Sequence, residues 1–402
     1  MKKLVYITVR TPFGKGEEFI LSEIETLIGL GVDLLVVPRN PPRRIFHQGV
    51  AELLPHTHRI PLFNATIAGS CIPFLIQEPR RFFETFGDLI HSSRNWKTAV
   101  KNLVILPKAL YLARILSKED VYHIHAHWAG TTATLAYVIS RLTGISWSMT
   151  VHRGDIRQDN LLVAKAQSAT FIRCISEHGA NLLRSYIGNG FDHKLKVIHM
   201  GVDCHDAIGP VPPEWETFVI AMPANLLPVK GHKYLIEACS LLLTRSTRNF
   251  KCFFYGEGPL RRELVRQVTD AKLGAYIEMP GQIPHHDLME RYRKREVHAV
   301  VLPSINTDDG EHEGIPVSLM EAMAHAIPVV ATATGGIPEL LGDGSGILVD
   351  EKNREQLADA MLRLMRDPGY YRSLGERGQA KVMGSFEITK CCQDLVRLFG
   401  LG

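Results

Sequence analysis

Short runs of β-branched and other apolar residues alternate with segments of helical periodicity along most of this chain. Strands and helices that alternate in this way form parallel sheets with helices on both faces, so the pattern predicts an α/β fold. Helices are expected at, among others, Glu17–Leu30, Lys230–Leu243 and Pro316–Ala326. The expected strands are Lys3–Val9, Val32–Val37, Val121–His125, Ser146–Val151, Thr170–Cys174, Lys196–His199, Thr217–Met222, Phe250–Tyr255, Tyr276–Met279, His298–Leu302, Pro328–Thr332 and Gly346–Val349.

The chain is too long for one hydrophobic core, and its pattern restarts in the middle. At 402 residues it exceeds the size that a single core usually serves, which predicts two domains. The proline-rich run at 209–213 cannot continue a helix or a central strand. We therefore expect Rossmann-like, doubly wound parallel sheets at residues 1–205 and 206–385, and a C-terminal helix at 386–402 that crosses back onto the first domain.

Composition and charge exclude several classes of protein. A net charge of +4 is too small to indicate a nucleic-acid partner. The 7 cysteines are odd in number and lack metal-ligand spacing, so we expect reduced, buried thiols and no metal site. The apolar run Leu4–Val9 is shorter than the roughly 7–15 residues of a signal peptide, and no apolar stretch reaches the roughly 20 residues of a membrane span. These features predict a cytoplasmic protein.

The segment from Glu313 to Glu321 carries the strongest functional signal. Pro316 suits the first turn of a helix, which places Glu313 in the preceding loop with Gly314 and Ile315, and Glu321 inside the helix. The first backbone N–H groups of a helix attract anions such as a diphosphate, and carboxylates accept hydrogen bonds from sugar hydroxyls. Two glutamates that merely end a helix and face solvent are the alternative interpretation.

Other turns follow predicted strands at the edge where open α/β sheets bind ligands. Gly335 and Gly336 open a helix and are expected to present backbone donors to a phosphate. Lys230 ends another such turn, and its ammonium suits a phosphate, although a solvated surface lysine is the alternative. Gly256 lies in a turn where the missing side chain lets a ligand approach the backbone. Gly14–Gly16 forms a turn without the dinucleotide fingerprint G-x-G-x-x-G.

Histidines cluster at two strand ends of the first domain. His123, His125 and His127 alternate along one predicted strand, so they share one face of it. A zinc site is one interpretation, but the sequence offers no partner motif for it. We expect one or two of them to be buried and hydrogen-bonded, and His127 to face the cleft near His152, which ends the next strand. Core histidines satisfied by the surrounding protein are the alternative for each.

The stretch 78–118 departs from the alternating pattern. It holds eight basic and three acidic residues together with many Phe and Leu side chains and Trp96, and it predicts one or two helices with a kink or break at Pro107. Basic, aromatic-rich segments dock on anionic membranes, so peripheral contact with the inner face of the membrane is one hypothesis. The alternative is a helix pair whose apolar residues are core and whose charges are solvated.

Together these residues resemble the retaining glycosyltransferases of family 4, which have the GT-B architecture of two Rossmann-like domains facing across a cleft. The spacing of Glu313 and Glu321 matches that family's E-x7-E motif, and the match extends over essentially the whole chain. It continues through Pro328–Ala331 and Gly335–Glu339. Two segments look most like the exopolysaccharide branch of the colanic acid and amylovoran type, namely His125–Ala129 and Glu313–Pro316.

The resemblance implies that the second domain holds a nucleotide sugar. Glu313 and His127 would be catalytic groups beside the transferred sugar, Glu321 would bind the ribose, and Lys230 would neutralise the diphosphate. Asn225 stands where the family usually has arginine, and Arg153 is a candidate substitute. The remaining donor-binding positions are Gly14, Gly16, His152, Asn225, Gly256, Ile283, Gly314, Ile315, Pro316, Gly335 and Gly336.

The implied reaction transfers a hexose, with retention, from a UDP- or GDP-linked sugar to a glycan or lipid-linked acceptor in polysaccharide or glycolipid biosynthesis. Fixed cations and helix N-termini stabilise the charge on the departing diphosphate, so no metal or other cofactor is expected. A nucleotide-sugar epimerase of the same fold, and a non-catalytic nucleotide-sugar-binding or scaffold protein, are the alternative functions.

Overall fold

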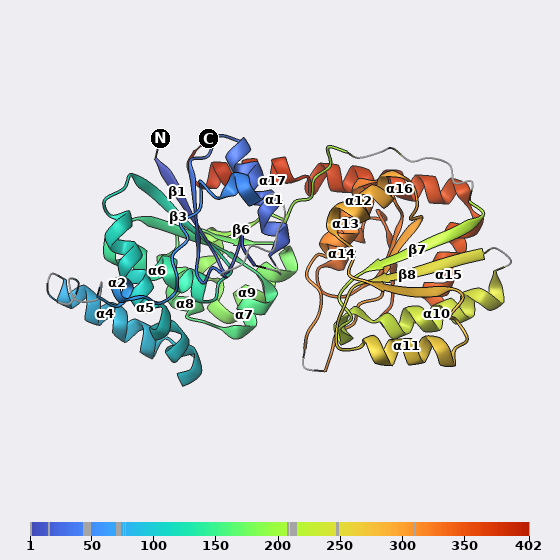
Figure 1. Ribbon diagram of the computed structural model, residues 1–402, viewed down its shortest axis with the longest axis horizontal. Helices are drawn as coiled ribbons and strands as arrows, with labels where there is room; N and C mark the ends of the chain where they lie inside the picture. Colours follow the sequence, from blue (N-terminus) through green and yellow to red (C-terminus); the bar gives the residue numbers. More distant parts are fainter. Residues whose placement is uncertain are drawn as a thin grey trace. The chain divides into compact units, whose positions relative to one another are not determined.

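The computed structural model describes residues 2–14, 17–42, 50–69, 74, 76, 78–206, 209, 215–246, 249–308 and 310–401. The chain divides into two compact units, of which unit 1 comprises Met1–His199 with Cys391–Gly402 and unit 2 comprises Met200–Lys390 (Figure 1). Within the described residues each unit contains one parallel sheet of six strands flanked by helices. The predicted α/β class with two doubly wound sheets is therefore confirmed.

The sheet of unit 1 has the strand order β2-β1-β3-β4-β5-β6. Its central strands are buried on both faces, as their continuous apolar runs require, and Leu4, Val5, Tyr6 and Ile7 are fully inaccessible to solvent. The six strands are β1 (Lys3–Thr8), β2 (Leu34–Pro38), β3 (Val121–His127), β4 (Ser146–Val151), β5 (Ile172–Cys174) and β6 (Leu195–Val197).

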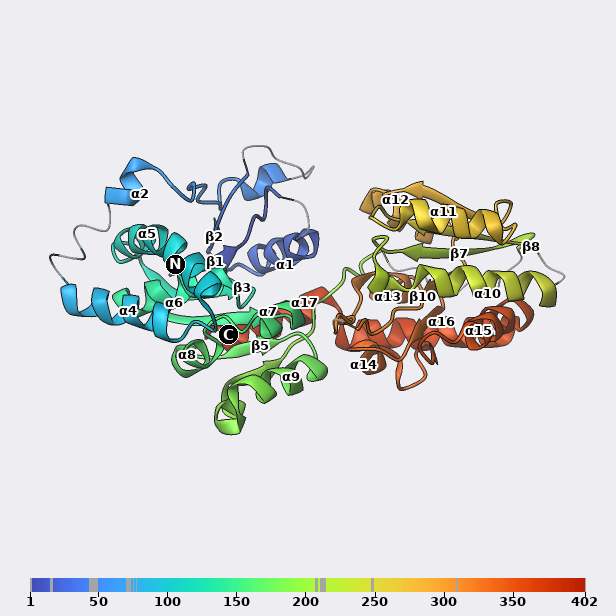
Figure 2. The ribbon, with the colours of Figure 1, turned by 90° about the horizontal axis from the view of Figure 1, so that it is seen from below.

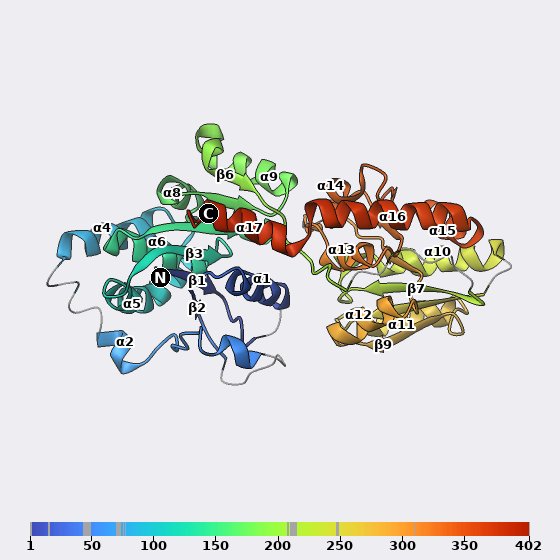
Figure 3. The ribbon, with the colours of Figure 1, turned by 90° about the horizontal axis from the view of Figure 1, so that it is seen from above.

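Helices cover both faces of this sheet. In Figures 1 and 3, α1 and α17 lie side by side on one face, and α5, α6, α8 and α9 lie on the other, which Figure 2 shows from below. The helical elements are α1 (Glu18–Gly29), η1 (Val50–Leu53), α2 (Ala65–Gly69), α4 (Pro79–His91), α5 (Trp96–Leu116), α6 (Thr131–Thr143), α7 (Arg153–Gln158), α8 (Leu162–Ser168), α9 (Glu177–Ile187), η2 (Asn189–Lys194) and α17 (Ile388–Leu398).

The sheet of unit 2 has the strand order β12-β11-β10-β7-β8-β9. Because the order reverses beside β7, the loops that follow β7 and β10 diverge there at the carboxyl edge of the sheet, where such folds bind ligands. The six strands are β7 (Thr217–Pro223), β8 (Asn249–Tyr255), β9 (Ile277–Gly281), β10 (Ala299–Leu302), β11 (Val329–Thr332) and β12 (Ile347–Val349).

Two groups of helices cover this second sheet. In Figure 1, α10 and α11 lie on one face, and α12, α13 and α16 lie on the other. The helical elements are η3 (Pro228–Lys230), α10 (His232–Arg245), α11 (Arg261–Asp270), α12 (His285–Arg293), α13 (Val317–Ala324), α14 (Ile337–Leu341), α15 (Arg354–Arg366) and α16 (Pro368–Ser385).

The stretch 78–118 forms two helices, α4 and α5, and Pro107 lies inside α5 without ending it. The apolar side of α5 belongs to the core, where Ile105, Leu106 and Leu112 are buried. The six cysteines in the described ranges are buried, as expected. No helix in the described ranges is both long enough and apolar enough to span a bilayer.

A buried ion pair joins the sheet of unit 1 to helix α1. Arg173 on β5 is fully buried and donates from Nη1 to Glu23 Oε2 on α1 at 2.6 Å. The same guanidinium donates to the carbonyls of Ile198 and His199 at 2.9 and 2.6 Å. Glu23 also accepts from the Tyr6 hydroxyl at 2.5 Å, so both charges have hydrogen-bond partners and their burial is tolerated.

The strand histidines form a ladder with hydroxyl side chains of the neighbouring strand. His123 contacts Ser146 Oγ at 3.0 Å and Ser148 Oγ at 2.8 Å. His125 contacts Ser148 Oγ at 2.8 Å and Thr150 Oγ1 at 2.9 Å. The parallel register sets His123 beside Ser146 and His125 beside Ser148, which brings each imidazole between two hydroxyls. The nitrogens of both rings are therefore already hydrogen-bonded inside the core of unit 1.

Burial disfavours the protonated form of His123 and of His152, so acid destabilises the folded chain. It lowers the pKa of His123 from 6.5 to about 4 and that of His152 to about 3. Between these values and 6.5 the unfolded chain binds protons that the folded chain does not. We therefore predict that the free energy of unfolding is highest above pH 6.5 and falls toward pH 4, by up to about 1.4 kcal/mol per pH unit for each histidine.

Urea unfolding followed by circular dichroism at about pH 7, 5.5 and 4.5 measures this slope. His123→Gln should flatten it, because one buried titrating ring is gone. His193→Gln is the matched control, since His193 is exposed and should leave the slope unchanged. Equal slopes for wild type and His123→Gln would contradict the prediction.

Candidate functional site

The loops after β7, β10 and β11 meet at the carboxyl edge of the unit 2 sheet. The three strands are neighbours, so their following loops leave the sheet side by side. Ile305 N donates to Val229 O at 2.8 Å, which ties the β10 loop to the β7 loop. Gly336 N donates to Gly314 O at 3.2 Å, which ties the β11 loop to the β10 loop. The predicted donor-site segments of unit 2 are thereby brought together.

Lys230, Ser304 and Glu313 converge on one point of this edge. Lys230 Nζ lies 2.5 Å from Glu313 Oε1, and Ser304 Oγ donates to the same oxygen at 3.0 Å. Only 22% of the Lys230 side chain and 11% of the Glu313 side chain are exposed, so neither is the solvated surface residue of the alternative interpretation. The group offers an ammonium for a phosphate and a carboxylate for hydroxyl groups. Ser304 was not among the predicted site residues.

Glycines allow these loops to approach so closely. Gly335 has φ +54°, and a Cβ placed on it would lie 1.9 Å from the Glu313 carbonyl oxygen. Gly231 has φ +71°, and a Cβ there would lie 1.8 Å from the Pro303 carbonyl oxygen. A side chain at either position would push Glu313 and Lys230 apart. Both glycines therefore set the geometry of the Lys230–Glu313 pair.

For Gly256 and Gly336 the structure differs from the expected role in ligand binding. A Cβ on Gly256 would lie 2.1 Å from the carbonyl oxygen of Ala224, so the neighbouring loop, and not open space for a ligand, occupies that side of its backbone. The Gly336 N–H already donates to Gly314 O, so in this structure it is not presented to a phosphate. Asn225 is exposed and brings no charge to the edge.

Glu321 and Ile283 mark the neighbouring part of the same edge. Glu321 lies inside α13, and 16% of its side chain is exposed. Its Oε1 atom accepts a hydrogen bond from His285 Nε2 at 2.7 Å. That hydrogen bond raises the pKa of His285, a residue that was not among the predicted site residues. Ile283 lines a cavity of about 530 Å³ at the ends of β8 and β9, together with Tyr255, Gln282 and Arg291.

In unit 1 the structure corrects the expectation for His127. All three strand histidines are buried, and His127 is fully inaccessible. Its Nδ1 lies 2.7 Å from the Tyr6 hydroxyl and its Nε2 lies 2.8 Å from Nε2 of His152. Both ring nitrogens are engaged within unit 1, so His127 does not face open space. His127 is the last residue of β3, and the rings of Phe19, Trp128 and His152 lie against it.

The hydrogen-bond chain defines the protonation of both rings. Tyr6 donates its one proton to Glu23, so at the other contact His127 Nδ1–H must donate to the Tyr6 oxygen. Burial holds the pKa of His127 well below its usual value, which keeps the ring neutral and its Nε2 an acceptor. His152 must then donate from Nε2. Glu23 thereby orients both histidines, a role that no short motif reveals.

Glu17 organises the loop that contains Gly14. It accepts from the backbone N–H groups of Arg10 and Thr11 at 2.7 and 3.0 Å and from Trp128 Nε1 at 2.7 Å. Gly14 N donates to Arg10 O at 3.2 Å, which closes a turn. The predicted site residue Gly16 lies outside the described residues. Arg153 begins α7 of unit 1, and its suggested substitution for the missing arginine at 225 stays a prediction.

The chain is similar in sequence to proteins of known families. Residues 211–381 match the family described as Glycosyl transferases group 1. WcaL of Salmonella typhimurium, named for colanic acid biosynthesis, is 37% identical over 51% of this chain and 50% of its own length, so that match spans about half of the relative. AmsK of Erwinia amylovora, an amylovoran biosynthesis glycosyltransferase, is 26% identical over 90% of both chains.

A solved structure shows the same architecture. Alr3699/HepE of Anabaena, crystallised in complex with UDP and glucose, has a TM-score of 0.70 over 100% of both chains at 16% identity. At that identity the likeness concerns the fold, and it confirms the GT-B arrangement of two Rossmann-like sheets expected from the sequence. Residues 211–381 therefore match the glycosyl transferases group 1 family, and the named relatives of the chain are glycosyltransferases.

Proposed function

We propose that the protein transfers a hexose, with retention, from a UDP- or GDP-linked sugar to a glycan or lipid-linked acceptor in polysaccharide or glycolipid biosynthesis. The observation that carries this proposal is the Lys230–Ser304–Glu313 group at the carboxyl edge of the unit 2 sheet. An ammonium and a carboxylate at one point suit a ligand that carries both phosphate and hydroxyl groups, as a nucleotide sugar does.

The rest of the edge suits the nucleoside part of the donor. The cavity of about 530 Å³ beside Ile283 contains the Tyr255 ring and the Arg291 guanidinium, which can contact a planar base. Glu321 lies in the same unit, where one of its carboxylate oxygens is hydrogen-bonded to His285. A carboxylate suits the two hydroxyls of a ribose. HepE was crystallised with UDP, and the relatives WcaL and AmsK are named for colanic acid and amylovoran biosynthesis; both facts agree with this proposal.

The proposed mechanism relies on charge stabilisation. As the bond from the anomeric carbon to the diphosphate breaks, negative charge develops on the diphosphate and positive charge on the sugar. Lys230 stabilises the first, and the carboxylate of Glu313 stabilises the second and holds sugar hydroxyls. The acceptor hydroxyl attacks from the side of the leaving group and passes its proton to the departing phosphate, which gives retention without a covalent intermediate.

Two substitutions test the donor site. Lys230→Ala and Glu313→Ala should each reduce transfer by more than about tenfold, because each removes a charge that acts in the transition state. Lys251→Ala is a matched control, since Lys251 is a half-exposed lysine of unit 2 whose partner is Glu278. The assay measures diphosphate release from a panel of UDP-, GDP- and ADP-sugars, with and without cell lipid extract.

The same assay separates the proposed transferase from its alternatives. Diphosphate release that requires the lipid extract supports transfer, release without any acceptor supports an epimerase, and binding without release supports a non-catalytic protein. Circular dichroism verifies that each variant is folded. Normal transfer by folded Lys230→Ala would show that the donor site has been assigned wrongly.

We also propose that 78–118 contacts the inner face of an anionic membrane. Phe83 on α4 and Trp96 on α5 are 62% and 72% exposed, and basic side chains lie near them in the sequence. Phe83→Ser with Trp96→Ser should reduce co-flotation with anionic vesicles at least about fivefold at low salt. Absence of flotation for the wild type would remove this part of the proposal.

A further inference from the structure

The imidazole of His285 contacts Glu321, and the proposed function gives this ring no role. His285 is the first residue of α12 and Glu321 lies inside α13, so the contact joins two separate helices on one face of the unit 2 sheet (Figure 1). His285 Nε2 lies 2.7 Å from Glu321 Oε1. Because an ionised carboxylate only accepts hydrogen bonds, the Nε2–H group of His285 is the donor whether the ring is neutral or charged.

The two partners of this contact differ in exposure. Only 16% of the Glu321 side chain is exposed, and the neighbouring residues Met320 and Ala322 are fully buried. The His285 side chain is 68% exposed, so its position depends on the hydrogen bond more than on packing. The hydrogen bond to Glu321 raises the pKa of His285, which is the direction expected when an ionised carboxylate accepts from an imidazole.

The backbone of Glu321 is fixed independently of His285. The Glu321 carbonyl oxygen accepts from His325 Nδ1 at 3.0 Å. The His325 ring packs against the ring of Tyr292 on α12, with centroids 5.7 Å apart, and both residues are buried. The contact with His285 therefore determines the direction of the Glu321 carboxylate and not the position of its helix.

One oxygen of the Glu321 carboxylate is left for a ligand. Oε1 accepts from His285, and no other residue in the described ranges hydrogen-bonds to Oε2. Glutamate has several rotatable bonds, so holding its side chain in one conformation before binding removes an entropic cost from the ligand. Each carboxylate oxygen has two acceptor positions, and a ribose presents two adjacent hydroxyls that can donate to Oε2.

The first turn of α12 also borders the cavity beside Ile283. Pro284 and Asp287 line that cavity, which the proposed function assigns to the base, and His285 lies between these two residues in the sequence. The imidazole is therefore close to the base cavity and bonded to the carboxylate that suits the ribose.

We propose that His285 is a positioning residue of the donor site, whose Nε2–H group holds Glu321 Oε1 so that Oε2 accepts hydrogen bonds from the two ribose hydroxyls of the donor. The inference rests on the proposed function, in which Glu321 binds the ribose, and it adds the residue that orients this carboxylate. Without the imidazole, Glu321 stays on α13 but its side chain rotates freely. Nucleotide binding then weakens, while the chemical step is unchanged.

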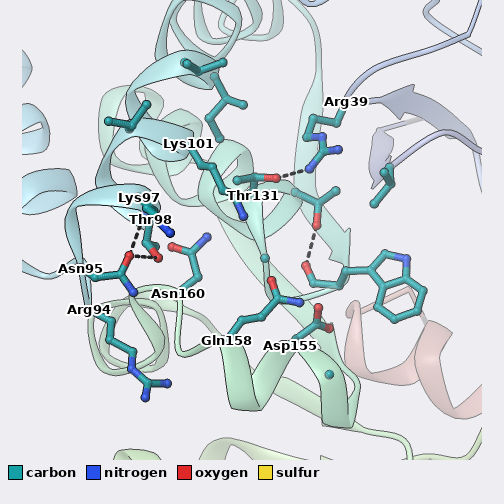
Figure 4. A pocket seen from close by; sticks show the side chains of 18 of the residues that line it. Arg39, Arg94, Asn95, Lys97, Thr98, Lys101, Thr131, Asp155, Gln158 and Asn160 are labelled. Carbon is teal, nitrogen blue, oxygen red and sulfur yellow. Dashed lines mark hydrogen bonds between the residues drawn. The ribbon is translucent and has the colours of Figure 1, made fainter. Parts of the chain in front are cut away.

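The effect of a change at His285 is confined to unit 2. A larger cavity, of about 930 Å³, lies in unit 1, where Figure 4 shows Arg39, Lys101 and Asp155 around it. All the residues that line this cavity belong to unit 1, so a substitution at His285 replaces none of them.

Nucleotides with and without ribose hydroxyls test this proposal on the full-length protein. Calorimetry measures the Kd of UDP or GDP, whichever the wild type binds more tightly, and of the dideoxy form that lacks both ribose hydroxyls. His285→Leu should weaken binding of the ribonucleotide at least about fivefold, because leucine is similar in size but has no N–H group. The same variant should bind the dideoxy form as the wild type does. His285→Gln, whose amide N–H can reach the same oxygen, should bind both as the wild type does.

His286→Leu is the matched control. His286 is the next residue of α12, 74% of its side chain is exposed, and it pairs with Asp287 at 2.8 Å. This variant should bind both nucleotides as the wild type does. Wild-type binding of the ribonucleotide by His285→Leu would overturn the proposal. An equal loss for the ribonucleotide and the dideoxy form would overturn it too, because a loss that ignores the hydroxyls indicates a merely structural role.

Failure of this proposal is separable from failure of the donor site. A wild type that binds neither UDP nor GDP refutes the donor site itself. A wild type that binds one of them, with binding weakened by Lys230→Ala and unchanged by His285→Leu, refutes the role of His285 alone. In the transfer assay, His285→Leu should raise the KM for the donor by the same factor as the Kd and keep kcat within about twofold of the wild type.

Discussion

The contact of Lys230 with Glu313 is the interaction on which the proposed chemistry of unit 2 depends. It joins the loop after β7 to the loop after β10, and Ser304 supplies a second donor to the same carboxylate oxygen. The two loops meet because Gly231 and Gly335 leave room where a Cβ would collide with carbonyl oxygens. An ammonium and a carboxylate are thus held together, largely shielded from water, before any ligand arrives. Such preorganisation is the main source of electrostatic stabilisation in enzymes.

Unit 1 uses buried charge for a different purpose. Arg173 and Glu23 sit inside the fold with all their polar atoms directed at protein partners, and Glu23 reaches His127 through Tyr6. Lys108 and Lys165 donate to main-chain carbonyls of the loops at the carboxyl edge of the unit 1 sheet. These buried groups hold strand ends and loops rigidly.

The sequence predicted the strands well because parallel strands buried on both faces are continuous apolar runs, and every expected strand overlaps an observed one. The Lys230, Glu313 and Glu321 segments were identified from their position at strand ends and from the family motif. Contacts between distant segments were not predictable. Glu17 and Ser304 resemble many other residues in the sequence, and only the fold brings them to Trp128 and Glu313. His127 was misjudged because strand alternation gives the face of a side chain but not what covers that face.

A crystal structure of the protein with UDP or GDP bound tests the central claim most directly. The account predicts the diphosphate in contact with Lys230 Nζ at the carboxyl edge of the unit 2 sheet, with the ribose near Glu321 and the base in the cavity beside Ile283. A diphosphate bound elsewhere, with Lys230 still paired only to Glu313, would contradict it.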